Sequence, residues 1–213
     1  MSSPEVALRR CWHDLGGTDG PVLDDLLARH REPQRRYHTT VHVMWVLRHV
    51  DDLLTDGLRS AESDGPVVRA AALFHDAVYD PRASTNEAES AALAVRALSP
   101  LGWAPAPLGR VAWLIEGTAG HDPAVAAGAP DAAVLFDADL AILGSSPAEY
   151  QAYVTGVRAE YAHVDAAGWR SGRAAVLRMF LDRERIYATA TMRTARERRA
   201  RANLAAELAG LGQ

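Results

Sequence analysis

Apolar residues recur every three to four positions along most of the chain, which is the spacing of one face of an α-helix. Alanine, leucine, arginine and glutamate are abundant and favour helices, whereas runs of β-branched residues are scarce. No alternating strand pair with a tight hairpin turn is evident. The pattern predicts helices at roughly 4–15, 21–31, 38–55, 66–79, 85–99, 105–119, 131–143, 147–163, 170–183 and 192–210.

The length and composition are those of one globular domain. The chain has 213 residues, of which 48% are hydrophobic and 23% are charged. The most loop-like segments lie at 55–65 and 120–130, and helical patterning resumes on both sides of each. No internal repeat or low-complexity linker is evident. We therefore expect a single all-α domain over residues 1–213, built as a helical bundle.

Composition also excludes several kinds of function. All 23 basic residues are arginine, so no lysine can form a Schiff base or hold a phosphate. The single Cys11 excludes an intramolecular disulfide and a cysteine-rich zinc site. A net charge of −4 gives no electropositive footprint for a nucleic acid polymer or an anionic membrane. Neither a signal peptide nor a membrane-spanning run is predicted, so we expect a cytoplasmic protein.

The dipeptide His75-Asp76 follows an apolar run, residues 70–74, that should be buried. An adjacent imidazole and carboxylate are costly to bury unless both are satisfied. A metal cation satisfies both, because histidine supplies nitrogen and aspartate supplies oxygen. A histidine hydrogen-bonded to a neighbouring carboxylate explains the dyad equally well, so both interpretations stay open.

A second candidate is a pair of histidines spaced one helical turn apart. His38 and His42 stand at i and i+4, and Trp45 lies near the same stripe. The pair can act as ligands, or as a ligand and an acid; packing of two interfacial histidines on Trp45 is the alternative. His49 lies about 10 Å along the axis from His42, too far to share one metal, and is taken as structural.

The third candidate is a pair of acids, Asp137 and Asp139, inside an otherwise apolar helix. Buried carboxylates are normally paired, hydrogen-bonded or bound to a metal. The alternative to a metal is a buried salt bridge to an arginine such as Arg158 or Arg173. On a helix the two acids lie about 200° apart, so only one of them should reach a given metal.

The order of these motifs resembles the HD superfamily of metal-dependent phosphohydrolases. The match is closest to the bacterial branch described as predicted metal-dependent HD superfamily phosphohydrolases, and it covers about residues 36–205. The set of motifs is specific, although each piece alone is weak. The segments that carry the resemblance are Tyr37 to His42, Phe74 to Pro81, Asn86-Glu87, Ser90-Ala91, Asp137 to Gly144 and Ile186-Tyr187.

The resemblance implies a metal site held by His42, His75, Asp76 and Asp139, with one or two divalent ions. Two imidazoles and two carboxylates suit Mn, Fe, Co, Ni or Zn better than Mg. A bound water of lowered pKa would attack phosphorus. Asp139 is preferred over Asp137 because Ala138-Asp139-Leu140 reads like the last motif of the family. Asp137 would then accept a hydrogen bond from a ligand histidine or pair with an arginine.

Two further residues are candidates for catalysis. His38 matches the position of the general acid in phosphodiesterase-like members of the superfamily; alternatively it orients His42 or a water. Asp80 lies four residues after Asp76 and would return to the same helix face, where it could orient the attacking water. A helix-end cap before Pro81 accounts for Asp80 equally well.

Three residues are candidates for binding the substrate. His121 lies in a predicted loop that could reach the site and bind phosphate or a second metal; a solvent-facing loop histidine is the alternative. Arg158 and Arg173 could clamp a phosphate, since guanidinium binds phosphate in a bidentate manner. With so many arginines in the chain, either could instead be surface charge.

We therefore expect a metal-dependent phosphohydrolase that acts on a small phosphorylated metabolite, for example a nucleotide. One alternative is a non-haem di-iron oxygenase on the same scaffold, which would need more histidines around a second metal. Another is a non-catalytic module that keeps the metal ligands. The sequence leaves the substrate, the physiological metal and the oligomeric state open.

Overall fold

The structure is a computed structural model that describes residues 3–55 and 63–212, so most of the predicted loop at 55–65 lies outside the described residues. Within the described ranges every regular element is helical and no strand occurs, which confirms the predicted all-α fold class. The α-helices are α1 (Pro4–Asp14), α2 (Pro21–Arg29), α3 (Thr40–Thr55), α4 (Gly65–Phe74), α5 (Asn86–Leu98), α6 (Pro105–Gly117), α7 (Pro123–Gly128), α8 (Pro130–Asp139), α9 (Pro147–Glu160), α10 (Ala166–Leu181) and α11 (Ala190–Gly210); two short 3₁₀ helices are η1 (Ser99–Leu101) and η2 (Leu140–Gly144).

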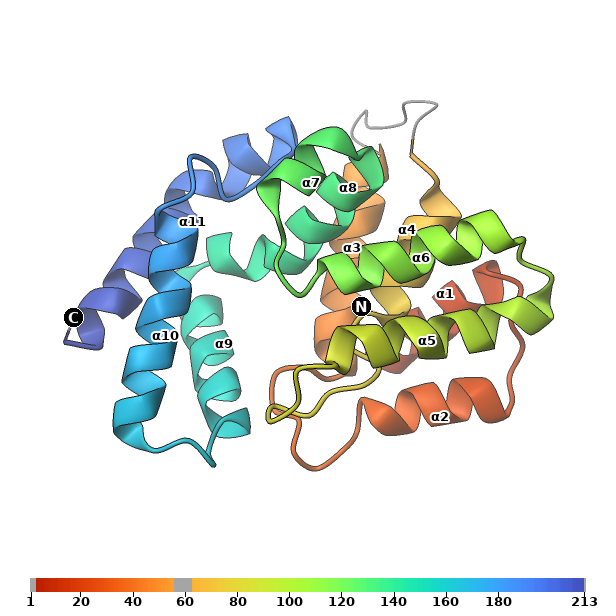
Figure 1. Cartoon of the computed structure of the whole chain (residues 1–213), viewed down its shortest axis with the longest axis horizontal. Coiled ribbons are helices and arrows are strands. Elements are labelled where there is room, and N and C mark those ends of the chain that lie inside the picture. The colour runs from red at the N-terminus through yellow and green to blue at the C-terminus, as the bar shows by residue number, and fades with distance from the viewer. Residues whose placement is uncertain (1–2, 56–62, 213) are drawn as a thin grey trace.

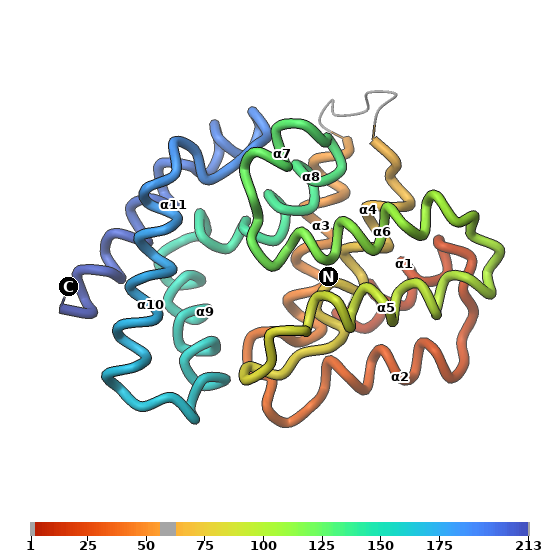
Figure 2. Tube along the Cα trace, viewed as in Figure 1, coloured from red at the N-terminus to blue at the C-terminus, as the bar shows by residue number. Residues whose placement is uncertain are grey.

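The helices form two groups with α7 and α8 between them. Helices α1 to α6 lie on one side, and α9, α10 and α11 lie on the other (Figure 1). Figure 2 shows the chain passing from α8 through η2 into α9, which joins the two groups. Helix α11 packs against α10 and against η2, which follows α8 directly. The C-terminal group is therefore attached to the protein next to the end of α8.

Helices α3, α4 and α8 pack against one another in the core. Their contact faces carry small and branched apolar side chains that are fully buried, including Val46, Ala71 and Val134. Burial of this kind contributes about 0.8 kcal/mol per methylene group removed from water. The mutual packing fixes the ends of these three helices relative to one another, and the candidate metal ligands stand at or next to those ends.

Two helix boundaries differ from the predicted ones in ways that shape the site. Helix α4 ends at Phe74 instead of continuing to 79, because the carbonyls of Asp76 and Ala77 accept hydrogen bonds from the Arg35 guanidinium. The restriction on the residue before Pro81 also disfavours helix there. Helix α3 begins at Thr40, two residues later than predicted.

A short helix, α7, occupies the segment 120–130 that was predicted as a loop. The Asp122 side chain accepts a hydrogen bond from the Ala124 N–H, and Pro123 takes the first helical position, where proline is well tolerated. Among residues 3–55 and 63–212, no helix combines the length and the apolar character needed to cross a bilayer.

Candidate metal centre

Four ligand-type side chains meet where α3, α4 and α8 converge. His42 stands in the first turn of α3, His75 and Asp76 follow α4 directly, and Asp139 is the last residue of α8. The Nε2 atom of His42 lies 3.0 Å from His75 Nε2 and 3.1 Å from Asp76 Oδ2. Asp139 Oδ1 lies 3.3 Å from His42 Nε2 and 3.6 Å from His75 Nε2. The ligands predicted for the metal are therefore brought together.

These separations suit a bound cation. Ligand atoms about 2.1 Å from one cation lie roughly 3.0 to 3.4 Å apart when the bonds meet at about 90° to 109°. The ligand atoms of His42, His75 and Asp76 all lie within 4.8 Å of one another, so these three residues can hold a metal ion. Asp139 adds a fourth ligand atom, an oxygen, at similar distances from both imidazoles. The donor set has two nitrogens and two oxygens, as transition metals prefer.

Hydrogen bonding fixes the orientation of one of the two imidazoles. His75 Nδ1 lies 2.9 Å from the Ala72 carbonyl and donates to it, which leaves the Nε2 lone pair directed at the cluster. Metal-binding histidines are commonly held by a second-nitrogen bond of this type. His42 differs, because its Nδ1 atom is buried without a hydrogen-bond partner. Two Nε2 atoms 3.0 Å apart need a proton or a cation between them, and a cation satisfies both lone pairs.

The local charges keep the two carboxylates ionised. Burial alone would raise the pKa values of Asp76 and Asp139, but the neighbouring His75 charge and the histidine hydrogen bonds hold both pKa values well below the ordinary range. Burial likewise lowers the pKa of His42, yet hydrogen bonds to Asp139 and Asp76 outweigh it and leave the pKa raised. The two carboxylates are thus anionic and depend on positive charge beside them, which a bound cation would supply while both imidazoles act as neutral ligands.

The second oxygen of Asp139 contacts His121. Asp139 Oδ2 lies 2.8 Å from His121 Nε2, so the carboxylate links His121 to the two imidazoles of the cluster. His121 has a backbone φ of 45°, an unfavourable conformation for a residue with a side chain. Strain of this kind is retained where the surrounding structure enforces it, often at functional sites. The structure therefore places His121 beside the metal centre, in contact with one of its ligands.

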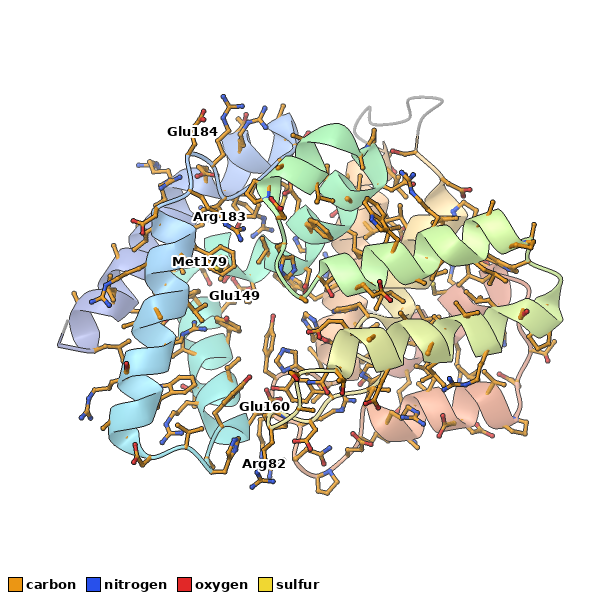
Figure 3. All side chains as sticks on the ribbon, viewed as in Figure 1. Arg82, Glu149, Glu160, Met179, Arg183 and Glu184 are labelled. Carbon is orange, nitrogen blue, oxygen red and sulfur yellow. The ribbon has the colours of Figure 1, made fainter. Side chains whose placement is uncertain are left out.

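His38 is held by a carboxylate that the sequence did not indicate. Glu160, at the end of α9 (Figure 3), has a fully buried side chain. Its Oε2 atom lies 2.7 Å from His38 Nδ1. Oε2 also accepts a hydrogen bond from the Tyr79 hydroxyl, and Oε1 accepts three backbone N–H groups, those of residues 36, 37 and 38. With Nδ1 directed at Glu160, the His38 ring lies beside His42, with 5.5 Å between ring centroids, and lines the cavity described below.

One signal in the sequence points to Glu160. Tyr150, Tyr153 and Val157 form an apolar stripe at helical spacing along α9, and Glu160 continues that stripe. A carboxylate on an apolar stripe has to find buried partners. Its partners come from a segment 124 positions earlier in the chain, and only the fold brings them together.

Acidification should lower the free energy of unfolding, because it protonates the buried carboxylate of Glu160. Burial alone would raise the pKa of Glu160, but the His38 hydrogen bond and charge, together with the backbone N–H groups, lower it to about 2 from an ordinary 4.5. A group with a lowered pKa stabilises the fold fully above its ordinary pKa and loses that effect as the pH falls toward the folded value. We expect urea unfolding to show Glu160→Gln less stable by about 3 kcal/mol at pH 7, with the gap narrowing below about pH 4.5.

Glu184→Gln is the matched control, because that side chain is 86% exposed and should change stability little at either pH. A constant difference between wild type and Glu160→Gln from pH 7 to pH 3 would contradict the role assigned to Glu160.

A buried arginine ties together the two segments that carry the site. The Arg35 side chain is fully buried and donates to the carbonyls of His38, Asp76 and Ala77 at 3.0, 2.7 and 3.1 Å. Its guanidinium also pairs with Glu32. Nothing in the periodicity marked Arg35, because it stands in a charged run that resembles an exposed surface segment. Arg35 is a positioning residue for His38 and Asp76.

Asp137 has a different role from the one predicted. Its two carboxylate oxygens accept the backbone N–H groups of Ala188 and Thr189 at 2.8 and 2.7 Å, just before α11. Burial raises the pKa of Asp137 to about 6, although these hydrogen bonds oppose the shift. Asp137 therefore fixes the start of α11, and the described contacts include no ligand histidine and no arginine hydrogen bond.

The two arginines predicted to clamp phosphate are engaged elsewhere. Arg158 donates to the carbonyls of Tyr161 and Val164 and covers the Trp169 ring, so it caps the end of α9. Arg173 is buried on α10 and forms a bidentate pair with Glu207 at 2.7 and 3.0 Å. These contacts satisfy both guanidinium groups away from the metal ligands, contrary to the prediction.

Asp80 also lies outside the site. Because α4 ends at Phe74, Asp80 does not return to the face that carries Asp76. Its side chain is exposed and accepts the Arg82 backbone N–H at 2.9 Å. The alternative interpretation, a local cap near Pro81, fits this arrangement, and the proposed orientation of the attacking water does not.

The metal centre opens into a cavity of about 560 Å³. Volumes of this size suit a small-molecule ligand. One side of the cavity carries the candidate site residues that reach it, which are His38, His42, Asp76, His121 and Asp139. Residues of α9 and α10 also line the cavity. Five of the ten candidate residues do not line this cavity: His75, which is buried against His42 and Asp76, and Asp80, Asp137, Arg158 and Arg173.

Comparisons of the chain with protein-family models, with curated proteins and with solved structures find no match. The site is therefore interpreted from its own geometry and chemistry.

Proposed function

We propose that this protein is a metal-dependent phosphohydrolase of the HD superfamily type that acts on a small phosphorylated metabolite. One observation carries the proposal: two imidazoles and two carboxylates converge beside a cavity that is also lined by a histidine held by a buried carboxylate. The resemblance of the sequence motifs to that superfamily supports the same conclusion.

The four converging side chains are the residues that would hold the cation, which are His42, His75, Asp76 and Asp139. The donor set favours Mn, Fe, Co, Ni or Zn. When bound, such a cation supplies a water of lowered pKa and neutralises charge that develops on the phosphoryl oxygens.

His38 is the proton donor in this proposal. Its Nδ1–H donates to Glu160, so Nε2 is the atom that delivers a proton to the leaving oxygen of the substrate. Glu160 fixes the orientation of the ring, and its own position is set by three backbone N–H groups. The Tyr79 ring packs on His38 with 4.3 Å between centroids, which restricts ring rotation further.

The test of the proposal is a phosphate-release screen over nucleotides and sugar phosphates. The protein is reconstituted separately with Mn, Fe, Co, Ni and Zn, and each sample is compared with a chelated one. Phosphate release that requires metal supports the proposal. Oxygen consumption that requires iron, without phosphate release, would favour the oxygenase on the same scaffold. Metal binding without turnover would favour a non-catalytic module.

Asp76→Asn should lower metal-dependent phosphate release by orders of magnitude. Asparagine keeps the size of the side chain but removes the charge that lies 3.1 Å from the Nε2 atoms of both His42 and His75. Asp25→Asn on α2 is the control, because Asp25 forms an exposed pair with Arg29. Near-wild-type release by Asp76→Asn, measured with saturating metal, would remove Asp76 from the proposed mechanism.

A further inference from the structure

The cavity next to the metal centre has two chemically different sides. Besides the metal ligands, the lining has an apolar and aromatic part, the α9–α10 wall, formed by side chains of α9, of the residue that ends it and of α10. These are Tyr153, Val157, Tyr161, Val176, Met179 and Phe180. Val176 and Met179 are 41% and 45% exposed, which is unusual for large apolar side chains and leaves apolar surface facing the cavity. Figure 3 shows Met179 on the side of α10 that faces the middle of the molecule.

The cavity lining carries no arginine among the described residues, and the chain has no lysine. The lining does include a third carboxylate, Glu87, besides the two of the metal centre. Behind the apolar wall, Arg173 donates to the Tyr153 hydroxyl and its charge is balanced by Glu207. A substrate phosphoryl group at the metal is therefore matched by the cation, whereas a second or third phosphoryl group meets no arginine or lysine side chain. The two histidines of the lining outside the metal ligands, His38 and His121, already pair with Glu160 and Asp139.

Arg183 contacts residues of the cavity lining and is therefore the arginine to consider as a partner for additional phosphoryl groups. It does not line the cavity but contacts two residues that do: its guanidinium carbon is 4.5 Å from the Phe180 ring centroid, and it donates to the Gly120 carbonyl at 2.9 Å. Its Nη1 atom is buried and has no hydrogen-bond partner. Because that atom is covered, it cannot contact a ligand in the cavity unless the wall rearranges. Arg183 therefore enters the test as a variant.

We propose that the substrate is a phosphomonoester with a single phosphoryl group and an aromatic or apolar remainder, and that the α9–α10 wall binds this remainder. The proposal rests on the proposed function for the orientation of the phosphoryl group toward the metal. Apolar burial against the wall favours the organic group. Glu87 and the absence of lining arginine disfavour additional phosphates, because each would be left unpaired near a carboxylate.

Hydrolysis tests the number of phosphoryl groups. The metal-loaded protein is assayed with AMP, ADP and ATP, which share one nucleoside and differ only in phosphate number. We expect kcat/KM for phosphate release to fall at least about tenfold from AMP to ADP. Equal or faster release from ADP or ATP would overturn the proposal. If wild type released phosphate from ADP or ATP as fast as from AMP, and Arg183→Met did not, Arg183 would be the residue that contacts the additional phosphoryl groups.

Binding tests the apolar remainder without relying on turnover. Benzylphosphonate and methylphosphonate cannot be hydrolysed by this route, and calorimetry with the metal-loaded protein measures both. We expect benzylphosphonate to bind roughly 10- to 100-fold more tightly. Equal affinities would overturn the proposal. Absence of phosphate release from every ester, with this contrast intact, would instead contradict the proposed function and leave the wall's preference supported.

A charge added to the wall should change the preference. Val176→Arg places a cation on an exposed position of the cavity lining, so the fold should tolerate it. We expect this variant to reduce the AMP-over-ADP preference and to weaken benzylphosphonate binding. Val6→Arg on α1 is the control, since Val6 is 52% exposed and does not line the cavity. An unchanged preference in Val176→Arg would show that the wall does not contact the substrate.

Discussion

His75→Ala will leave the protein without a stoichiometric divalent metal. The Nε2 atom of His75 lies within 3.0 to 3.6 Å of the ligand atoms of His42, Asp76 and Asp139, and its orientation is fixed by the Ala72 carbonyl. Removing it takes away one imidazole ligand and leaves two carboxylates close together with less positive charge to stabilise them. Plasma mass spectrometry after reconstitution and desalting should find at least one ion per chain in wild type and essentially none in His75→Ala.

His13→Ala provides the control for this measurement. His13 precedes an aspartate in the sequence, as His75 does, but its side chain is exposed on α1 and contacts Asp19. The control should retain the metal content of wild type. Circular dichroism of both variants separates loss of metal from loss of fold. A folded His75→Ala protein with wild-type metal content would rule out this cluster as the metal centre.

Asp139→Asn and Asp137→Asn should have different effects: the first should remove the metal, and the second should lower stability while metal binding changes little. Asp139 lies against both imidazoles, so its loss should empty the site. Asp137 holds the backbone N–H groups of Ala188 and Thr189 before α11. An asparagine there replaces one acceptor with a donor, which should cost about 1–3 kcal/mol of stability. Metal affinity in Asp137→Asn should change by less than the roughly 10- to 100-fold typical of residues that support a ligand.

The two measurements are metal content per folded chain and urea unfolding, made on the same preparations. If Asp137→Asn emptied the site while Asp139→Asn remained loaded, the assignment of the ligand would be reversed.

The fold class followed from the sequence because helical periodicity and alanine-rich composition act locally. The ends of the helices depended on tertiary contacts. Helix α4 was predicted to continue to 79, but Arg35 binds the carbonyls of Asp76 and Ala77, and the helix ends at Phe74. This early end changes the site, because it removes Asp80 from the face of Asp76.

The metal ligands could be nominated from the sequence because burying histidine and aspartate side chains without partners is costly. The residues that hold these ligands in position could not be nominated in this way. Glu160 and Arg35 act through backbone groups of distant segments, and no spacing rule connects residues 124 positions apart. The prediction that Arg158 and Arg173 bind phosphate fails for a related reason. Guanidinium groups are numerous in this chain, and only the structure shows that Arg173 already pairs with Glu207.

The most direct test of the account is anomalous diffraction from crystals of the protein loaded with Mn or Zn. A difference map calculated from data at the metal absorption edge locates the ion independently of any activity. The account predicts a peak about 2.0 to 2.3 Å from His42 Nε2, His75 Nε2 and carboxylate oxygens of Asp76 and Asp139. A fully loaded crystal with its peak elsewhere, or with no peak among these four side chains, would contradict it.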